Sequence, residues 1–158
     1  MGLAVVEDDP VAKNQLGWIQ VTPACTDYGL SDARMRELVR EAATQSYPIA
    51  QFNLGRYLLR RHGGNDVRRQ EALCWIYRSI EGGYGVGAEY LSRHYLLGGE
   101  GVHNLVLSRG FYRIARAENV QREGMARLAQ AHPSTQVSIE ENSRFLAERL
   151  EECADLLS

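Results

Sequence analysis

The four histidines of this sequence are the first side chains to test for chemistry, because histidine binds metals and transfers protons near neutral pH. They are His62, His94, His103 and His132. None belongs to a metal-ligand pattern such as HExxH. Three of them fall at expected helix ends or in turns, where an exposed histidine is ordinary. We therefore predict no metal site.

Cysteine is the second reactive residue type, and its spacing is equally uninformative for catalysis. Cys25, Cys74 and Cys153 are an odd number and contain no CxxC pair. Disulfide-rich scaffolds and structural zinc sites both need several closely spaced cysteines. The sequence therefore predicts buried free thiols, which behave as small apolar side chains.

One glycine-rich segment, residues 83–88 (GYGVGA), contains a variant of the dinucleotide-binding fingerprint. That fingerprint requires a strand directly before it and an acidic residue ~20 positions later. Here an amphipathic helix containing Trp75 precedes it, so the segment is interpreted as a turn. The sequence contains neither GxSxG nor GxxxxGK[ST]. We expect no enzymatic activity and no cofactor.

Arginines provide the better candidate site. Asn53, Arg56 and Arg60 lie within about 60° of one another on a helical wheel, on the side away from the apolar residues. Arg93 and His94 are the nearest equivalents in a later segment. A solvated helix face is one explanation. The other is a binding face for an acidic or carboxylate-ended peptide, since the arginine fork matches a carboxylate.

Charge is segregated along the chain. Residues 1–33 carry a net charge of −4, residues 34–127 carry +6, and residues 128–158 carry −4. A basic middle between acidic ends indicates an electrostatically selective surface. The excess is too small for a typical nucleic-acid footprint. The acidic end of one subunit could also meet the basic middle of another, so a homodimer stays open.

The elements that would position these arginines form an internal repeat. Three large apolar residues, Leu38, Trp75 and Phe111, are separated by 37 and 36 positions, and each is followed four residues later by a small residue. A period in the thirties is typical of stacked helical hairpins. We predict seven helices, near residues 31–46, 49–61, 68–82, 87–97, 106–118, 121–131 and 138–157.

The two ends of the chain differ from the repeats. Ser138 and Glu141 fit a capping box, so the last helix is expected to begin at Ser138 and to cap the solenoid. Residues 1–30 contain two prolines and no helical period, which predicts an extended arm. Trp18 either packs this arm onto the helical body or occupies the binding groove.

The segment 50–83 resembles a Sel-one-like repeat, a relative of the tetratricopeptide repeat, nearly end to end. The resemblance rests on Ala50, Leu54-Gly55, Tyr57, Gly63-Gly64, Asp66, Ala72, Trp75, Ser79-Ile80 and Gly83. A second copy, residues 88–124, departs more from the pattern. Together with a partial copy upstream, the resemblance covers about residues 31–131.

This resemblance implies an all-α fold, an α/α solenoid of helical hairpins, and an adaptor or scaffold role in protein complexes, often in bacterial signalling or envelope processes. The expected partner is a protein or peptide held on the inner face of the repeats, with an acidic or carboxylate-bearing segment. A small regulatory subunit or inhibitor of one enzyme is the alternative, and a nucleic-acid binder is a third. The N-terminus lacks the basic residues of a secretory signal, so the expected location is the cytoplasm.

Overall fold

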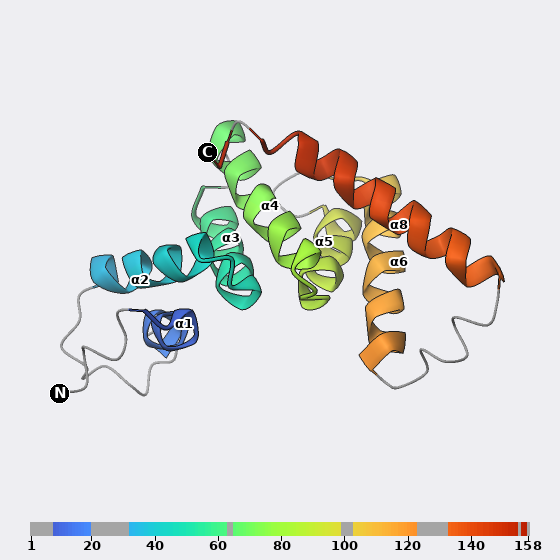
Figure 1. Ribbon diagram of the computed structural model, residues 1–158. Coiled ribbons are helices and arrows are strands. Elements are labelled where there is room, and N and C mark those ends of the chain that lie inside the picture. Colours follow the sequence, from blue (N-terminus) through green and yellow to red (C-terminus); the bar gives the residue numbers. More distant parts are fainter. Residues whose placement is uncertain are drawn as a thin grey trace.

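The computed structural model describes residues 8–19, 32–62, 65–98, 103–122, 133–154 and 156–157. These residues contain seven α-helices and no strand (Figure 1). The predicted all-α fold class is therefore confirmed at this level. None of the helices in the described segments is long and apolar enough to cross a membrane.

The helices follow the predicted boundaries closely over the middle of the chain. Their bounds are α1 Pro10–Ile19, α2 Asp32–Thr44, α3 Pro48–His62, α4 Asp66–Glu81, α5 Val86–Leu97, α6 Leu105–Arg122 and α8 Pro133–Glu151. For α2 to α5, each end lies within two residues of the prediction. Most of the helix predicted at 121–131 lies outside the described residues.

Local chemistry explains where these helices begin and end. Pro48 starts α3, where proline's missing N–H is no loss because the first helical N–H has no partner in the helix. Asn65 caps α4, since its side chain accepts a hydrogen bond of 3.1 Å from the backbone N–H of Arg68. Gly98 ends α5 with φ of 68°, a left-handed conformation that favours glycine.

Helices adjacent in sequence pack in pairs. The most extensive contacts join α3 to α4, α5 to α6 and α1 to α2, and α2 with α3 and α4 with α5 link one pair to the next. Helix α8 extends from α6 to α4 and contacts both of them (Figure 1). Helices α2 to α6 and α8 therefore share one continuous apolar core.

The repeat positions form this core as predicted. Leu38, Trp75 and Phe111 are all buried, with at most 4% of their surface exposed. Gly55 lies where α3 meets α4, and a Cβ added there would be only 2.6 Å from the backbone oxygen of Ala72. Glycine is required at this position because any side chain would push the two helices apart.

The prediction that residues 1–30 form an extended arm is wrong for the part that the structure describes. Pro10–Ile19 form helix α1. The Asp9 side chain accepts a 2.9 Å hydrogen bond from the backbone N–H of Val11, and Pro10 is the first helical residue, so Asp9-Pro10 is a helix start that the sequence did contain. The side chain of Trp18 lies outside the described residues.

Helix α8 also begins earlier than predicted. It starts at Pro133, so Ser138 is an interior residue of the helix and the predicted capping box is wrong. Leu146 and Leu150 of this helix pack on the core, and Cys153, just after its end, is buried. The glutamates on its other side are exposed.

The prediction of free buried thiols is wrong for two of the three cysteines. Cys74 of α4 and Cys153, just after α8, form a disulfide across a sequence separation of 79 residues. Sequence spacing could not reveal the pair, because only the passage of α8 over α4 brings the two Cα atoms to 5.5 Å. Both residues are buried. Cys25 lies outside the described residues.

Candidate functional site

A concave surface lies where α1, α3 and α5 meet, and it contains several of the predicted site residues. We call it the α3–α5 groove. Its volume is about 450 Å³. It is lined by Asn14, Ile49, Phe52, Asn53, Arg56, Tyr84, Val86, Glu89, Tyr90 and Arg93.

Three of the five predicted residues line the groove, namely Asn53, Arg56 and Arg93. Arg60 is exposed and is not part of the lining. His94 also lies outside it, behind Tyr90, with the two rings stacked at a centroid distance of 6.2 Å. The structure thus brings the two halves of the predicted site together through Arg56 of α3 and Arg93 of α5.

Asn53 has a structural partner of its own. Its Nδ2 donates a 3.0 Å hydrogen bond to Oδ1 of Asn14 in α1. Both residues are buried, with 7% and 6% of their surfaces exposed. Since the amide is already engaged and covered, Asn53 fixes the wall of the groove rather than offering a free amide to a ligand.

Arg56 is the central cation of the groove. It is half-buried, and its guanidinium carbon lies 5.4 Å from the centre of the Phe52 ring. Burial, and next the positive charge of Arg60, lower the pKa of the Arg56 guanidinium. Arginine nevertheless stays charged in proteins. A carboxylate entering the groove would therefore meet a cation that is partly removed from water, where charge-assisted hydrogen bonds are stronger.

Arg93 is more exposed and already forms an ion pair. Its Nη2 lies 3.3 Å from Oε1 of Glu89, one helical turn earlier. Exposed pairs of this kind contribute about 0.3–0.5 kcal/mol, so an incoming carboxylate can replace Glu89 at small cost. Two arginines, Arg56 and Arg93, and one glutamate, Glu89, lie in the described lining, so the groove carries one excess positive charge.

Aromatic side chains form the floor of the groove. Phe52 contacts the Tyr84 ring at 5.4 Å and the Tyr90 ring at 5.6 Å, the latter edge to face. Such pairs hold rings in fixed orientations. Phe52 is buried and also packs on the apolar core, together with the partly buried Tyr84 and Tyr90. Their second role, as the floor of a concave surface, depends on the helix arrangement and could not be seen in the spacing.

A second concave surface, the α2–α3 hollow, lies beside Leu54, Tyr57 and Leu58 and measures about 750 Å³. Its rim carries four arginines and one glutamate: Arg34, Arg36, Arg40, Arg61 and Glu37. Arg34 pairs with Glu37 and Glu41, and Arg40 pairs with Glu71. The hollow is thus more basic than the groove but lacks its aromatic floor.

Metal chemistry finds no support in the described segments. They contain no group of three or more histidine, cysteine, aspartate or glutamate side chains placed to hold an ion.

No protein family, no curated protein and no solved structure matches this chain.

Proposed function

We propose that the chain is a protein interaction module, an adaptor or scaffold that holds a segment of another protein in the α3–α5 groove. The pairing of α1 with α2, α3 with α4 and α5 with α6 is consistent with stacked hairpins of an α/α solenoid, the architecture that the Sel-one-like resemblance implies. Solenoids of this kind present extended concave surfaces to their partners.

The observation that carries the proposal is the pairing of charge with aromatic surface in one groove. Arg56 and Arg93 stand on neighbouring helices at the edge of a floor made by Phe52, Tyr84 and Tyr90. Arginine and aromatic residues are the side chains that most often dominate the energetics of protein interfaces. A groove that combines them suits an extended peptide better than a small substrate, because it offers several contacts along its length.

The partner segment proposed here is acidic or ends in a carboxylate. The arginine fork donates two parallel hydrogen bonds to a carboxylate, and each charge-assisted bond contributes roughly 1.5–3 kcal/mol. Glu89 makes the groove selective for acidic segments. A neutral segment cannot replace the Glu89 carboxylate as the partner of Arg93.

A small regulatory subunit or inhibitor is the second candidate, and one surface favours it. Exposed apolar side chains gather around the end of α5 and the start of α6, where Leu96, Leu97, Leu105 and Val106 are between 47% and 76% exposed. Apolar surface that stays exposed often marks a protein interface. This region is separate from the groove, so the two candidates predict different residues at the interface.

The cytoplasmic location expected from the sequence stays a prediction, and the disulfide counts against it. Disulfides are rare in compartments where glutathione and thioredoxin keep thiols reduced. The Cys74–Cys153 pair is consistent with a chain that folds under oxidising conditions.

Selection from a random peptide library displayed on phage tests the proposed function without a known partner. The wild-type protein is the bait, and the Arg56→Ala/Arg93→Ala variant is used for counter-selection. We expect enriched peptides to carry aspartate, glutamate or a free carboxyl end and to be lost on the variant. Enrichment of apolar peptides that still bind the variant, but not Leu97→Asp/Val106→Asp, would favour the second candidate instead.

A further inference from the structure

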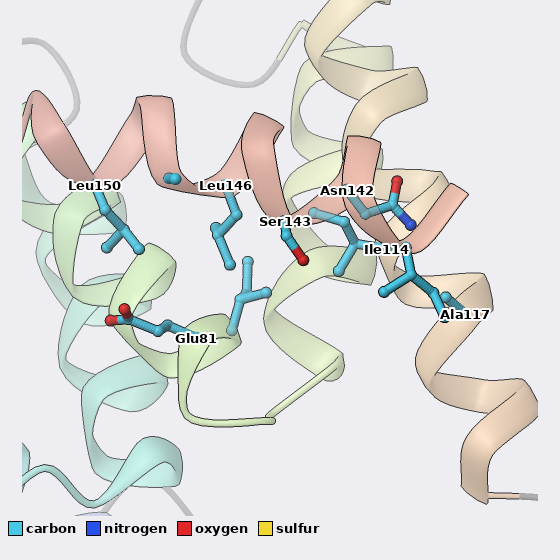
Figure 2. A pocket seen from close by; sticks show the side chains of 10 residues that line it. Glu81, Ile114, Ala117, Asn142, Ser143, Leu146 and Leu150 are labelled. Atoms are coloured by element: carbon cyan, nitrogen blue, oxygen red, sulfur yellow. The ribbon is translucent and has the colours of Figure 1, made fainter. Parts of the chain in front are cut away.

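A separate cavity lies beneath the C-terminal helix, away from the α3–α5 groove. We call it the α8 cavity; it lies where α8 meets α4 and α6 and measures about 360 Å³ (Figure 2). Its lining is mainly apolar and includes Ile80, Ile114 and Leu146. Cavities of this size are within the range of about 300–1,000 Å³ in which proteins bind small molecules.

One polar side chain in this lining has nothing to bind. Asn142 is 93% buried, since only 7% of its surface is exposed. Neither its Nδ2 nor its Oδ1 has a hydrogen-bond partner. Buried polar groups are nearly always hydrogen-bonded, and one left unpaired lowers stability. Leucine would avoid that cost among apolar neighbours, so the asparagine is best explained by a group that it binds.

The surroundings of Asn142 define the chemistry of that group. A carboxamide donates from Nδ2 and accepts at Oδ1, so it matches a neutral group that does both, such as another carboxamide or a hydroxyl. Glu81 is the one ionisable residue in the described lining, and Figure 2 places it at the opposite end from Asn142. A negative ligand would therefore enter a cavity that holds no cation to receive it.

We propose that the α8 cavity binds a small neutral molecule with an apolar body and an amide or hydroxyl group. The apolar body would lie along Ile80, Ile114 and Leu146, and the polar group would pair with Asn142. The site lies on other helices than the groove, so a failure of either proposal leaves the other standing.

Binding of hexanamide tests this proposal, with hexanoate at pH 7 as the matched anion of similar size and shape. We expect saturable binding of hexanamide by NMR titration, with shift changes centred on α8 and α4, and at least tenfold weaker binding of hexanoate. Asn142→Leu should remove the preference for the amide and raise the melting temperature of the free protein. Arg144→Gln, at an exposed residue of α8 outside the lining, should change neither.

Ala147→Phe is a second variant, which tests the cavity without changing Asn142. Ala147 is exposed and lines the cavity, so a phenyl ring there should block hexanamide binding while leaving the fold intact. Equal binding of hexanamide and hexanoate would overturn the proposal. So would a lower melting temperature of Asn142→Leu, because that result would mean that water or protein already satisfies the amide.

Discussion

The Nδ2 atom of Asn53 in α3 donates a buried hydrogen bond of 3.0 Å to Oδ1 of Asn14 in α1. This contact joins residues 39 positions apart and makes the N-terminal helix one wall of the α3–α5 groove. A segment that the sequence suggested was an appendage is therefore part of the candidate site. The stability of the groove depends on how firmly α1 is held.

Lys13 and Glu41 provide the ionic part of that attachment. Lys13 Nζ lies 3.0 Å from Glu41 Oε2, and only 6% of the lysine side chain is exposed. Glu41→Gln leaves the buried ammonium without its anion. We expect the free energy of unfolding to fall by roughly 1–2 kcal/mol. This loss is smaller than that expected for a fully buried ion pair, because Glu41 is partly exposed. Amides of α1 should also exchange faster with deuterium.

Glu37→Gln is the matched control, since Glu37 is 60% exposed and pairs with Arg34. The hydrogen bond from Lys13 lowers the pKa of Glu41, so the stabilisation is present at neutral pH and is lost as acid protonates the carboxylate. Unchanged exchange in α1 of Glu41→Gln would show that the ion pair does not hold the helix.

Trp75 tests the repeat register. It is 4% exposed at the large apolar position of the repeat, and the guanidinium carbon of Arg78 lies 5.8 Å from the centre of its ring. Trp75→Ala should lower the free energy of unfolding by roughly 3–5 kcal/mol, because it leaves a cavity in the core. Urea denaturation measures the loss. Tyr112→Ala serves as control, since Tyr112 is 57% exposed and should cost no more than about 0.5 kcal/mol. An unchanged free energy of unfolding in Trp75→Ala would mean that the repeat register is wrong.

The Cys74–Cys153 disulfide should contribute substantially to stability. It closes a loop of 79 residues, and removal of such a bond typically costs about 2–4 kcal/mol. We expect this loss in Cys74→Ala/Cys153→Ala. Thiol titration of the oxidised, denatured wild type should find one free thiol per chain, that of Cys25. Three free thiols in protein purified without reductant would contradict the bond.

The buried phenol groups of Tyr77 and Tyr95 should make the folded protein less stable in alkali. Their hydroxyl oxygens lie 3.3 Å apart in the core, and burial raises the pKa of both phenols. The unfolded chain releases these protons near pH 10 while the folded chain keeps them. Stability is therefore fully present below about pH 10 and falls above it, by up to about 1.4 kcal/mol per pH unit for each phenol.

Urea midpoints measured between pH 8 and pH 11 check this dependence. Cys25→Ser is the suitable background, because it prevents thiol–disulfide exchange in alkali. The alkaline slope should decrease in Tyr77→Phe, which removes one of the two protons. The same slope in both proteins would mean that other groups cause the loss.

The sequence predicted the parts of this fold that depend on local signals. The predicted ends of α2 to α5 lie within two residues of the observed ends, because the signals at Pro48, Asn65 and Gly98 act over a few positions. The burial of Trp75 follows from the repeat. The start of α1 carried a local signal as well, Asp9 followed by Pro10, which the lack of a helical period concealed.

Features that join distant segments could not be predicted in the same way. The Cys74–Cys153 bond and the Asn53–Asn14 hydrogen bond exist only because helices far apart in the chain pack together. The candidate site was predicted only in part, because one of its walls comes from a helix far away in the sequence. Arg56 and Arg93 were found from their positions on helix faces, whereas the contribution of Asn14 required knowledge of how α1 docks.

The most direct test of the central claim is the affinity of a selected acidic peptide, measured by calorimetric titration into three proteins. They are the wild type, Arg56→Ala/Arg93→Ala in the groove, and Arg36→Ala/Arg61→Ala, which removes the same charge from the rim of the α2–α3 hollow. We predict at least tenfold weaker binding to the groove variant, from the loss of charge-assisted hydrogen bonds, and less than a threefold change for the hollow variant. Wild-type affinity in the groove variant, with loss in the hollow variant, would contradict the account and move the binding site to α2 and α3.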